Sequence, residues 1–96
     1  MSYKLLCAFA LFGFVSAAQA DESDRLIDQY TCKDITREGG TARDNAIAFL
    51  HGYFVGKSGA LTFNLEALAK QTDAFIDHCL DNPKEKAIDA MSKVKA

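Results

Sequence analysis

The sequence predicts an all-α protein: a small single-domain helical bundle of about four helices with one disulfide. Three observations lead to this prediction. After a leader, the apolar residues recur at the spacing of helix faces, and no segment alternates with the period of a strand. Gly, Asn and Pro residues divide this part of the chain into helix-sized segments. Two of the three cysteines, Cys32 and Cys79, lie beyond the leader.

The first 20 residues have the pattern of a secretory signal peptide. Lys4 supplies a positive charge, Leu5–Val15 is an apolar run of eleven residues, and Ala18-Gln19-Ala20 is a small-x-small cleavage site. The run is too short for a permanent membrane anchor, and no other apolar stretch approaches that length. We therefore predict a cleaved signal peptide over 1–20 and a helical domain over 21–96. This domain would reside, without a membrane attachment, in the periplasm.

The predicted mature domain is short and nearly balanced in charge. It holds 76 residues with 10 basic and 13 acidic side chains, so its formal charge is −3. This balance gives no basic surface for nucleic acid. With its carboxyl groups neutralised in acid, ten bases and two histidines would leave a charge of about +12. Such a swing permits an acid response through like-charge repulsion, although almost any ordinary domain charges up in acid.

Cys32 and Cys79 are predicted to pair, because an exported chain with an even, low cysteine count forms disulfides. The bridge would close a loop of about 48 residues and stabilise the fold by roughly 4 kcal/mol. That contribution is comparable with the whole stability of so small a domain. One covalent tie would also hold the two ends of this loop together when the packing loosens.

The first helical segment, around Ser23–Glu38, is weak because it has few large apolar residues. Within it, Thr31 is expected to cap a short turn that carries Cys32, and Gly39-Gly40 ends the segment.

The next helix is expected over Ala42–Val55, with Thr41 as its N-cap. Its apolar stripe has a period of 3.6 and consists of Ala42, Ala46, Phe49, Leu50, Tyr53 and Phe54. Further apolar residues flank the stripe, so the helix is apolar around much of its circumference. A second copy of the chain or helices of the same chain must cover the remainder, and we favour a homodimer.

Gly56 and Gly59 are predicted to end this helix, and Asn64 to cap a third one over about Leu65–Leu80. The apolar face of the third helix consists of Leu65, Leu68, Phe75, Ile76, Cys79 and Leu80, so Cys79 should face the core. Asn82-Pro83-Lys84-Glu85 then predicts the start of a last helix, with Asn as the cap. The apolar residues of that helix are Ala87, Ile88, Met91 and Val94.

No pattern in the sequence predicts a catalytic, cofactor or metal site, and we expect no enzyme. Gly52–Ser58 resembles a phosphate-binding loop, but three residues separate its glycines where four are needed. It also ends a helix instead of joining a strand to one.

The two histidines and the acidic pair Asp73 and Asp77 do not change that conclusion. His51 falls off the apolar stripe, and His78 adjoins a cysteine that has a better partner in Cys32. Both histidines are expected to be solvated or half-buried, though either could titrate in mild acid. Asp73 and Asp77 share a helix face that is expected to be solvated.

Four short segments together resemble a known family. They are Tyr30–Asp34, Phe49–Lys57, Leu61–Leu65 and Phe75–Pro83, the last of which contains Cys-x-x-Asn-Pro. With the cysteine spacing and the Gly52-Tyr53 pair, they resemble the HdeA/HdeB family of periplasmic acid-stress chaperones over about Tyr30–Met91.

The resemblance implies a small all-helical protein with a Cys32–Cys79 bridge that dimerises at neutral pH. It also implies an ATP-independent holdase, which keeps unfolding periplasmic proteins soluble in acid. Carried onto this sequence, it places the helix Phe49–Phe54 in the dimer or client surface. The chain departs from relatives that carry tryptophan in that helix, since it has none.

The sequence therefore favours a holdase whose apolar residues are covered at neutral pH and exposed in acid. These residues are Phe49, Leu50, Tyr53 and Phe54. The alternative is a periplasmic binding or immunity-type protein, which would block a toxin or an enzyme through a constitutive apolar helix face.

Overall fold

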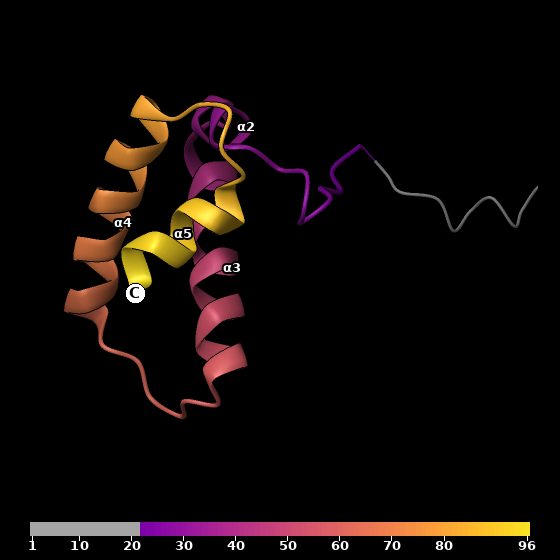
Figure 1. Cartoon of the computed structure of the whole chain (residues 1–96). Coiled ribbons are helices and arrows are strands. Elements are labelled where there is room, and N and C mark those ends of the chain that lie inside the picture. Colours follow the sequence, from indigo (N-terminus) through magenta and orange to yellow (C-terminus); the bar gives the residue numbers. More distant parts are fainter. Residues whose placement is uncertain (1–21) are drawn as a thin grey trace, which may run out of the picture.

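The computed structural model describes residues 22–96, so the predicted signal peptide over 1–20 and its cleavage site lie outside the described range. Within residues 22–96 there are four helices and no strand, which confirms the predicted all-α class. The helices are α2 (Cys32–Arg37), α3 (Gly40–Ser58), α4 (Leu65–Asp81) and α5 (Ala87–Lys95). The long helices α3 and α4 are joined by a loop at one end, while α2 lies at the other end and α5 crosses between them (Figure 1).

Helix α2 begins where the sequence predicts, because Thr31 forms a capping box. The Thr31 hydroxyl accepts a hydrogen bond from the Asp34 amide at 3.2 Å, and the Thr31 amide donates to the Asp34 carboxylate at 3.0 Å. Residues 22–30 are turns and irregular chain, so the predicted helical segment Ser23–Glu38 is helical only over α2. Few apolar side chains in residues 22–29 are available to bury a helix face there.

Helix α3 begins earlier and ends later than predicted. Its N-cap is Gly39, which offers no side-chain cap, and Thr41 lies inside the first turn. Gly40, the first residue of the helix, has a φ of 36°, which is in a region that other residues disfavour. The helix continues through Gly56 and ends at Ser58, because Gly59 adopts the left-handed conformation typical of a C-cap.

The bounds of α4 follow the prediction closely, but Leu65 and Leu80, which were placed on its apolar face, are exposed because they lie at the two ends of the helix. Asn64 caps α4 by accepting from the Ala67 amide at 2.8 Å.

The start of α5 also differs from the prediction. Helix α5 begins after Lys86 instead of at Pro83. The carbonyls of Pro83 and Glu85 accept hydrogen bonds from the first amides of α2, at 2.9 and 2.8 Å. A helix starting at Pro83 would direct these carbonyls along its own axis and leave the α2 amides unsatisfied.

The predicted disulfide Cys32–Cys79 is present and ties α2 to α4, with a Cα–Cα distance of 4.8 Å. Both cysteines are fully buried, which confirms that Cys79 faces the core. Among the four helices, α3 and α4 have the weakest direct contact. Helix α5 fills the space between them with three side chains that have no exposed area, namely Ala87, Ala90 and Met91.

The buried face of α3 differs from the predicted stripe. Ile47, Leu50 and His51 are buried, whereas Phe49 is half exposed. The predicted stripe joined Phe49 with Leu50 because α3 is apolar on several sides, and periodicity alone does not settle which side meets the rest of the bundle.

Candidate functional site

Three of the four residues predicted to form the dimer or client surface are linked by ring contacts into an aromatic face on α3, in which Phe54 is half-buried and also packs against the core. The rings of Phe49 and Tyr53 have centroids 6.3 Å apart, and those of Tyr53 and Phe54 meet edge to face at 5.2 Å. The Lys57 ammonium lies 5.4 Å from the Tyr53 ring centroid. The fourth residue, Leu50, is buried and faces the core, so it becomes accessible only when α3 leaves the bundle.

A second apolar area lies at the α3–α4 loop, in the segment Leu61–Leu65, which the sequence analysis named for the family resemblance but not as an exposed surface. We call Leu61, Phe63 and Leu65 the loop-end cluster; their side chains are 98%, 64% and 75% exposed. Phe63 and Leu65 also line a hollow of about 460 Å³ between α3 and α4. Large apolar residues at alternate positions in a segment without helical period are the sequence signal that could have identified this cluster.

A further hollow, of about 530 Å³, separates α3 from the residues that precede α2. We call residues 22–30 the N-terminal arm. From the arm, Ile27 and Tyr30 line this hollow, and from α3 the apolar lining includes Ala46, Phe49 and Leu50. The arm therefore borders one side of the predicted surface, and contacts that hold the arm control access to that side.

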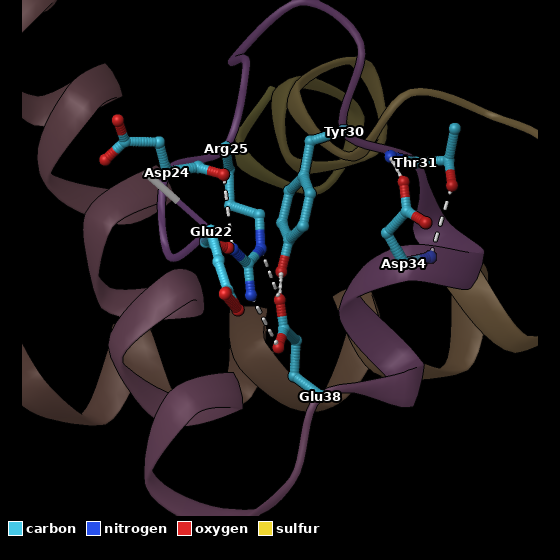
Figure 2. Close-up of polar contacts among 7 residues, drawn as sticks. All are labelled: Glu22, Asp24, Arg25, Tyr30, Thr31, Asp34 and Glu38. Carbon is cyan, nitrogen blue, oxygen red and sulfur yellow. Dashed lines mark hydrogen bonds and ion pairs between the residues drawn. The ribbon is translucent and has the colours of Figure 1, made fainter. Parts of the chain in front are cut away.

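Glu38 holds the N-terminal arm through a cluster of hydrogen bonds (Figure 2). Arg25 donates to both oxygens of the Glu38 carboxylate, at 2.9 and 3.2 Å, and the Tyr30 hydroxyl donates to one of them at 2.7 Å. The Arg25 guanidinium also donates to the carbonyls of Glu22 and Asp24. These contacts require an ionised Glu38, so the arm is secured by a group that acid neutralises.

The environment of this cluster lowers the pKa of the carboxyl group and raises the pKa of the phenol. The hydrogen bonds from Arg25, and then that from Tyr30, lower the pKa of Glu38. Burial, followed by the hydrogen bond to Glu38, raises the pKa of Tyr30. At α2, the Thr31 amide lowers the pKa of Asp34.

A second carboxylate cluster centres on Glu85 and joins α4 to α5. The Lys93 ammonium lies 2.7 Å from one Glu85 oxygen, and the His78 imidazole lies 2.6 Å from the other. Both contacts lower the pKa of Glu85, with that of Lys93 the larger cause. His78 is half-buried, as predicted.

His51 does not lie where the sequence analysis placed it. Its side chain is buried between α3, α4 and α5, with Nε2 2.8 Å from the Thr72 hydroxyl and Nδ1 3.0 Å from the Lys95 ammonium. Burial, and then the neighbouring Lys95 charge, lowers the pKa of His51. The prediction of a solvated or half-buried ring was wrong because the ring's partners come from two other helices.

The remaining sequence candidates form no reactive arrangement. Asp73 and Asp77 are both exposed on α4, as predicted, and Gly52–Ser58 lies within α3. Residues 22–96 contain no group of three or more His, Cys, Asp or Glu side chains placed to hold a metal ion. No helix in that range has the length and apolar character needed to cross a membrane.

Comparison with known proteins gives one match. No curated protein and no solved structure matches the chain significantly. The family model for the HdeA/HdeB family matches residues 3–89, which is nearly the whole chain. This family is known for acid-stress chaperones of the periplasm. The all-helical fold with its Cys32–Cys79 bridge agrees with what the sequence resemblance implied, and the chain belongs to the HdeA/HdeB family.

Proposed function

We propose that this protein is an ATP-independent holdase of the periplasm, which exposes apolar surface in acid and keeps unfolding proteins soluble. The proposal rests on one observation: an apolar area lies beside contacts that need an ionised carboxylate. The aromatic face of α3 borders a hollow whose other wall is the N-terminal arm, held by Glu38. Family membership supports the same function.

Acid would weaken the carboxylate contacts that hold the helices and the N-terminal arm in place. Asp34, Glu38 and Glu85 all have folded-state pKa values below their unfolded values. Their contribution to stability is therefore present above the unfolded carboxyl pKa of about 4 and is lost as pH falls through the folded values. Neutralising them would release the N-terminal arm, the cap of α2 and the contact between α4 and α5.

The surface made available would suit extended apolar segments of unfolding clients. Phe49 and Tyr53 offer aromatic side chains, and the loop-end cluster of Leu61, Phe63 and Leu65 is already exposed. The net positive charge gained in acid would keep the complexes dispersed. The disulfide would meanwhile hold α2 to α4, so that the chain loosens without extending fully.

We further propose that a second copy covers the outer side of α3 at neutral pH. Gly52 and Gly56 are both exposed on α3, and apart from the helix's own backbone no described atom comes within 4 Å of a Cβ added at either position, so a partner helix could approach closely. An isologous pairing of α3 helices would bury the aromatic face in both subunits at once. Acid repulsion between the subunits would then expose it.

The function is tested by light scattering from a globular enzyme that aggregates at pH 3, with and without equimolar holdase dimer. We expect the wild-type protein to suppress the scattering, and Phe49→Ser or Phe63→Ser to reduce that suppression at least two-fold. Leu80→Ser is the matched control, because Leu80 is 63% exposed, as is Phe63 at 64%, but lies at the other end of α4. Unchanged scattering in the presence of wild type would contradict the proposal.

The alternative of a binding or immunity-type protein draws support from the loop-end cluster, which is exposed without any acid step. In that case the protein would capture one toxin or enzyme equally well at pH 7 and pH 4 in a pull-down. Phe63→Ser would abolish this capture at both pH values. A holdase instead binds many unfolded chains and does so only in acid.

A further inference from the structure

Among the polar and charged residues that the structure describes, His51 is the one that is buried. It projects from α3 into the space between α3, α4 and α5, where it also lines the 460 Å³ hollow. The proposed client surface does not use it. Its contacts point to a separate role.

The contacts of the ring define its protonation state. The Lys95 ammonium can only donate hydrogen bonds, so Nδ1 must carry the lone pair that accepts from it at 3.0 Å. Nε2 then carries the proton and donates to the Thr72 hydroxyl at 2.8 Å. The ammonium also donates to the Gln71 side-chain carbonyl at 2.8 Å. One neutral tautomer thus joins α5 to both long helices.

A proton on Nδ1 is incompatible with this arrangement. Two donors and two positive charges would then face each other across 3.0 Å. Few groups near the ring could stabilise a second positive charge. Helix α5 presents the charged Lys95, and α4 presents the neutral Gln71 and Thr72. On α3 itself, Asp44 lines the same hollow. Within residues 22–96, no carboxylate makes a hydrogen bond or an ion pair with the ring.

We infer that His51 is an early acid trigger: protonation of Nδ1 displaces the Lys95 ammonium and frees the C-terminal end of α5 from α3 and α4. The loss of stability from His51 begins at a higher pH than the loss from the carboxylates. An unfolded imidazole has a pKa near 6.5, and that of His51 is lowered in the fold. Stability is therefore lost as pH falls from about 6.5 toward the folded value, whereas the carboxylate contributions are lost only below about pH 4.

Release of α5 matters because α3 and α4 have little direct contact and rely on α5 between them. In Figure 1 the end of α5 lies between the two long helices, away from α2. Cys32 and Cys79 tie the α2 end, so the opening would begin at the end that carries the loop-end cluster. The consequence for client binding rests on the function proposed above, but the titration itself does not.

The trigger is tested on the oxidised, exported protein by following the His51 ring signal in proton NMR and the binding of a hydrophobic dye from pH 7.5 to pH 2. In the wild type, dye binding should begin in the range where His51 takes up its proton. His51→Gln can donate to Thr72 and accept from Lys95 without titrating, so its dye onset should move at least one pH unit lower. His78→Gln, the matched control, should not move the onset to lower pH.

Lys95→Met provides a second variant that keeps the histidine. Without the ammonium, His51 should titrate at a higher pH than in the wild type, and the dye onset should nevertheless move lower, because the folded state then tolerates the proton. A purely structural role for Lys95 would lower stability at all pH values and leave the His51 titration in place.

An unchanged dye onset in His51→Gln, or an unchanged His51 titration in Lys95→Met, would overturn the trigger. Far-UV circular dichroism at pH 7.5 verifies that each variant folds. Client scattering at pH 3 separates this inference from the proposed function: failure of the wild type there contradicts the holdase, whereas normal suppression with an unshifted onset contradicts the trigger alone.

Discussion

Individual residues set the order in which this fold responds to acid. His51 accepts a hydrogen bond from an ammonium and opposes its own protonation, so it acts in the range below about pH 6.5. The carboxylates of Asp34, Glu38 and Glu85 act at lower pH. Their partners are one amide, a guanidinium, a phenol, an imidazole and an ammonium. The same domain thus contains two sets of acid-sensitive contacts that respond in sequence.

Glu38→Gln should reveal the contribution of the arm contact and its pH dependence. The variant should be less stable than the wild type at pH 7, because Arg25 loses its ionic partner. The pKa of Glu38 is lowered in the fold, so the wild-type advantage should shrink as pH falls through that value. Urea unfolding at pH 7, 5 and 2 measures the difference.

Asp73→Asn is the control for this series. Asp73 is exposed on α4, and its side chain makes no hydrogen bond or ion pair with any residue in 22–96. It should match the wild type at every pH. A constant difference between Glu38→Gln and the wild type from pH 7 to pH 2 would show that Glu38 acts through packing instead of its charge.

At the scale of elements, the accuracy of the sequence predictions depended on where each helix finds its partners. The start of α4 was predicted correctly because Asn64 caps it with a local hydrogen bond. The start of α5 was wrong because the carbonyls of Pro83 and Glu85 serve amides of α2, far away in the sequence. Local chemistry is visible in a sequence, and pairing between distant segments is not.

The residues of the candidate site also differ in whether local sequence patterns could predict their positions. The aromatic face of α3 follows from spacing along one helix, and the sequence predicted Phe49, Tyr53 and Phe54. The burial of His51 was missed because Thr72 and Lys95 come from α4 and α5. Since periodicity classed His51 as off the stripe, only the packing of three helices could reveal its position.

Helix α5 should be the element on which the whole bundle depends. Met91 has no exposed area, and deleting its side chain leaves a cavity between α3 and α4. Met91→Ala should therefore lower the free energy of unfolding by about 2–5 kcal/mol, measured by urea denaturation at pH 7. Ser92→Ala, at the exposed neighbouring position, should change it by less than about 0.5 kcal/mol. Equal effects of the two substitutions would contradict this role of α5.

At the scale of the whole molecule, the two ends of the bundle differ in how they are held. The α2 end has the Cys32–Cys79 disulfide, the capping box of Thr31 and the backbone hydrogen bonds to residues 83–87. The opposite end has the α3–α4 loop, whose apolar side chains face solvent. A protein built in this way can open at one end and remain closed at the other.

Reduction of the disulfide should remove that asymmetry. In the chain-entropy model the bridge contributes roughly 4 kcal/mol, which is comparable with the stability of so small a domain. We expect the reduced protein, or a double Cys→Ser variant, to be largely unfolded at pH 7 by far-UV circular dichroism, while the oxidised protein is helical. A reduced protein with the helical content and urea midpoint of the oxidised form would contradict this account.

Acid is expected to uncover apolar surface while the disulfide-linked end of the chain stays closed. Size-exclusion chromatography with a hydrophobic dye, run on the oxidised protein from pH 7 to pH 2, tests it most directly. We expect dimers to separate and the dye signal to rise over the same pH range, first as His51 is protonated and further as Glu38 and Glu85 are neutralised. A dye signal that stays flat down to pH 2, with an unchanged elution volume, would contradict the account.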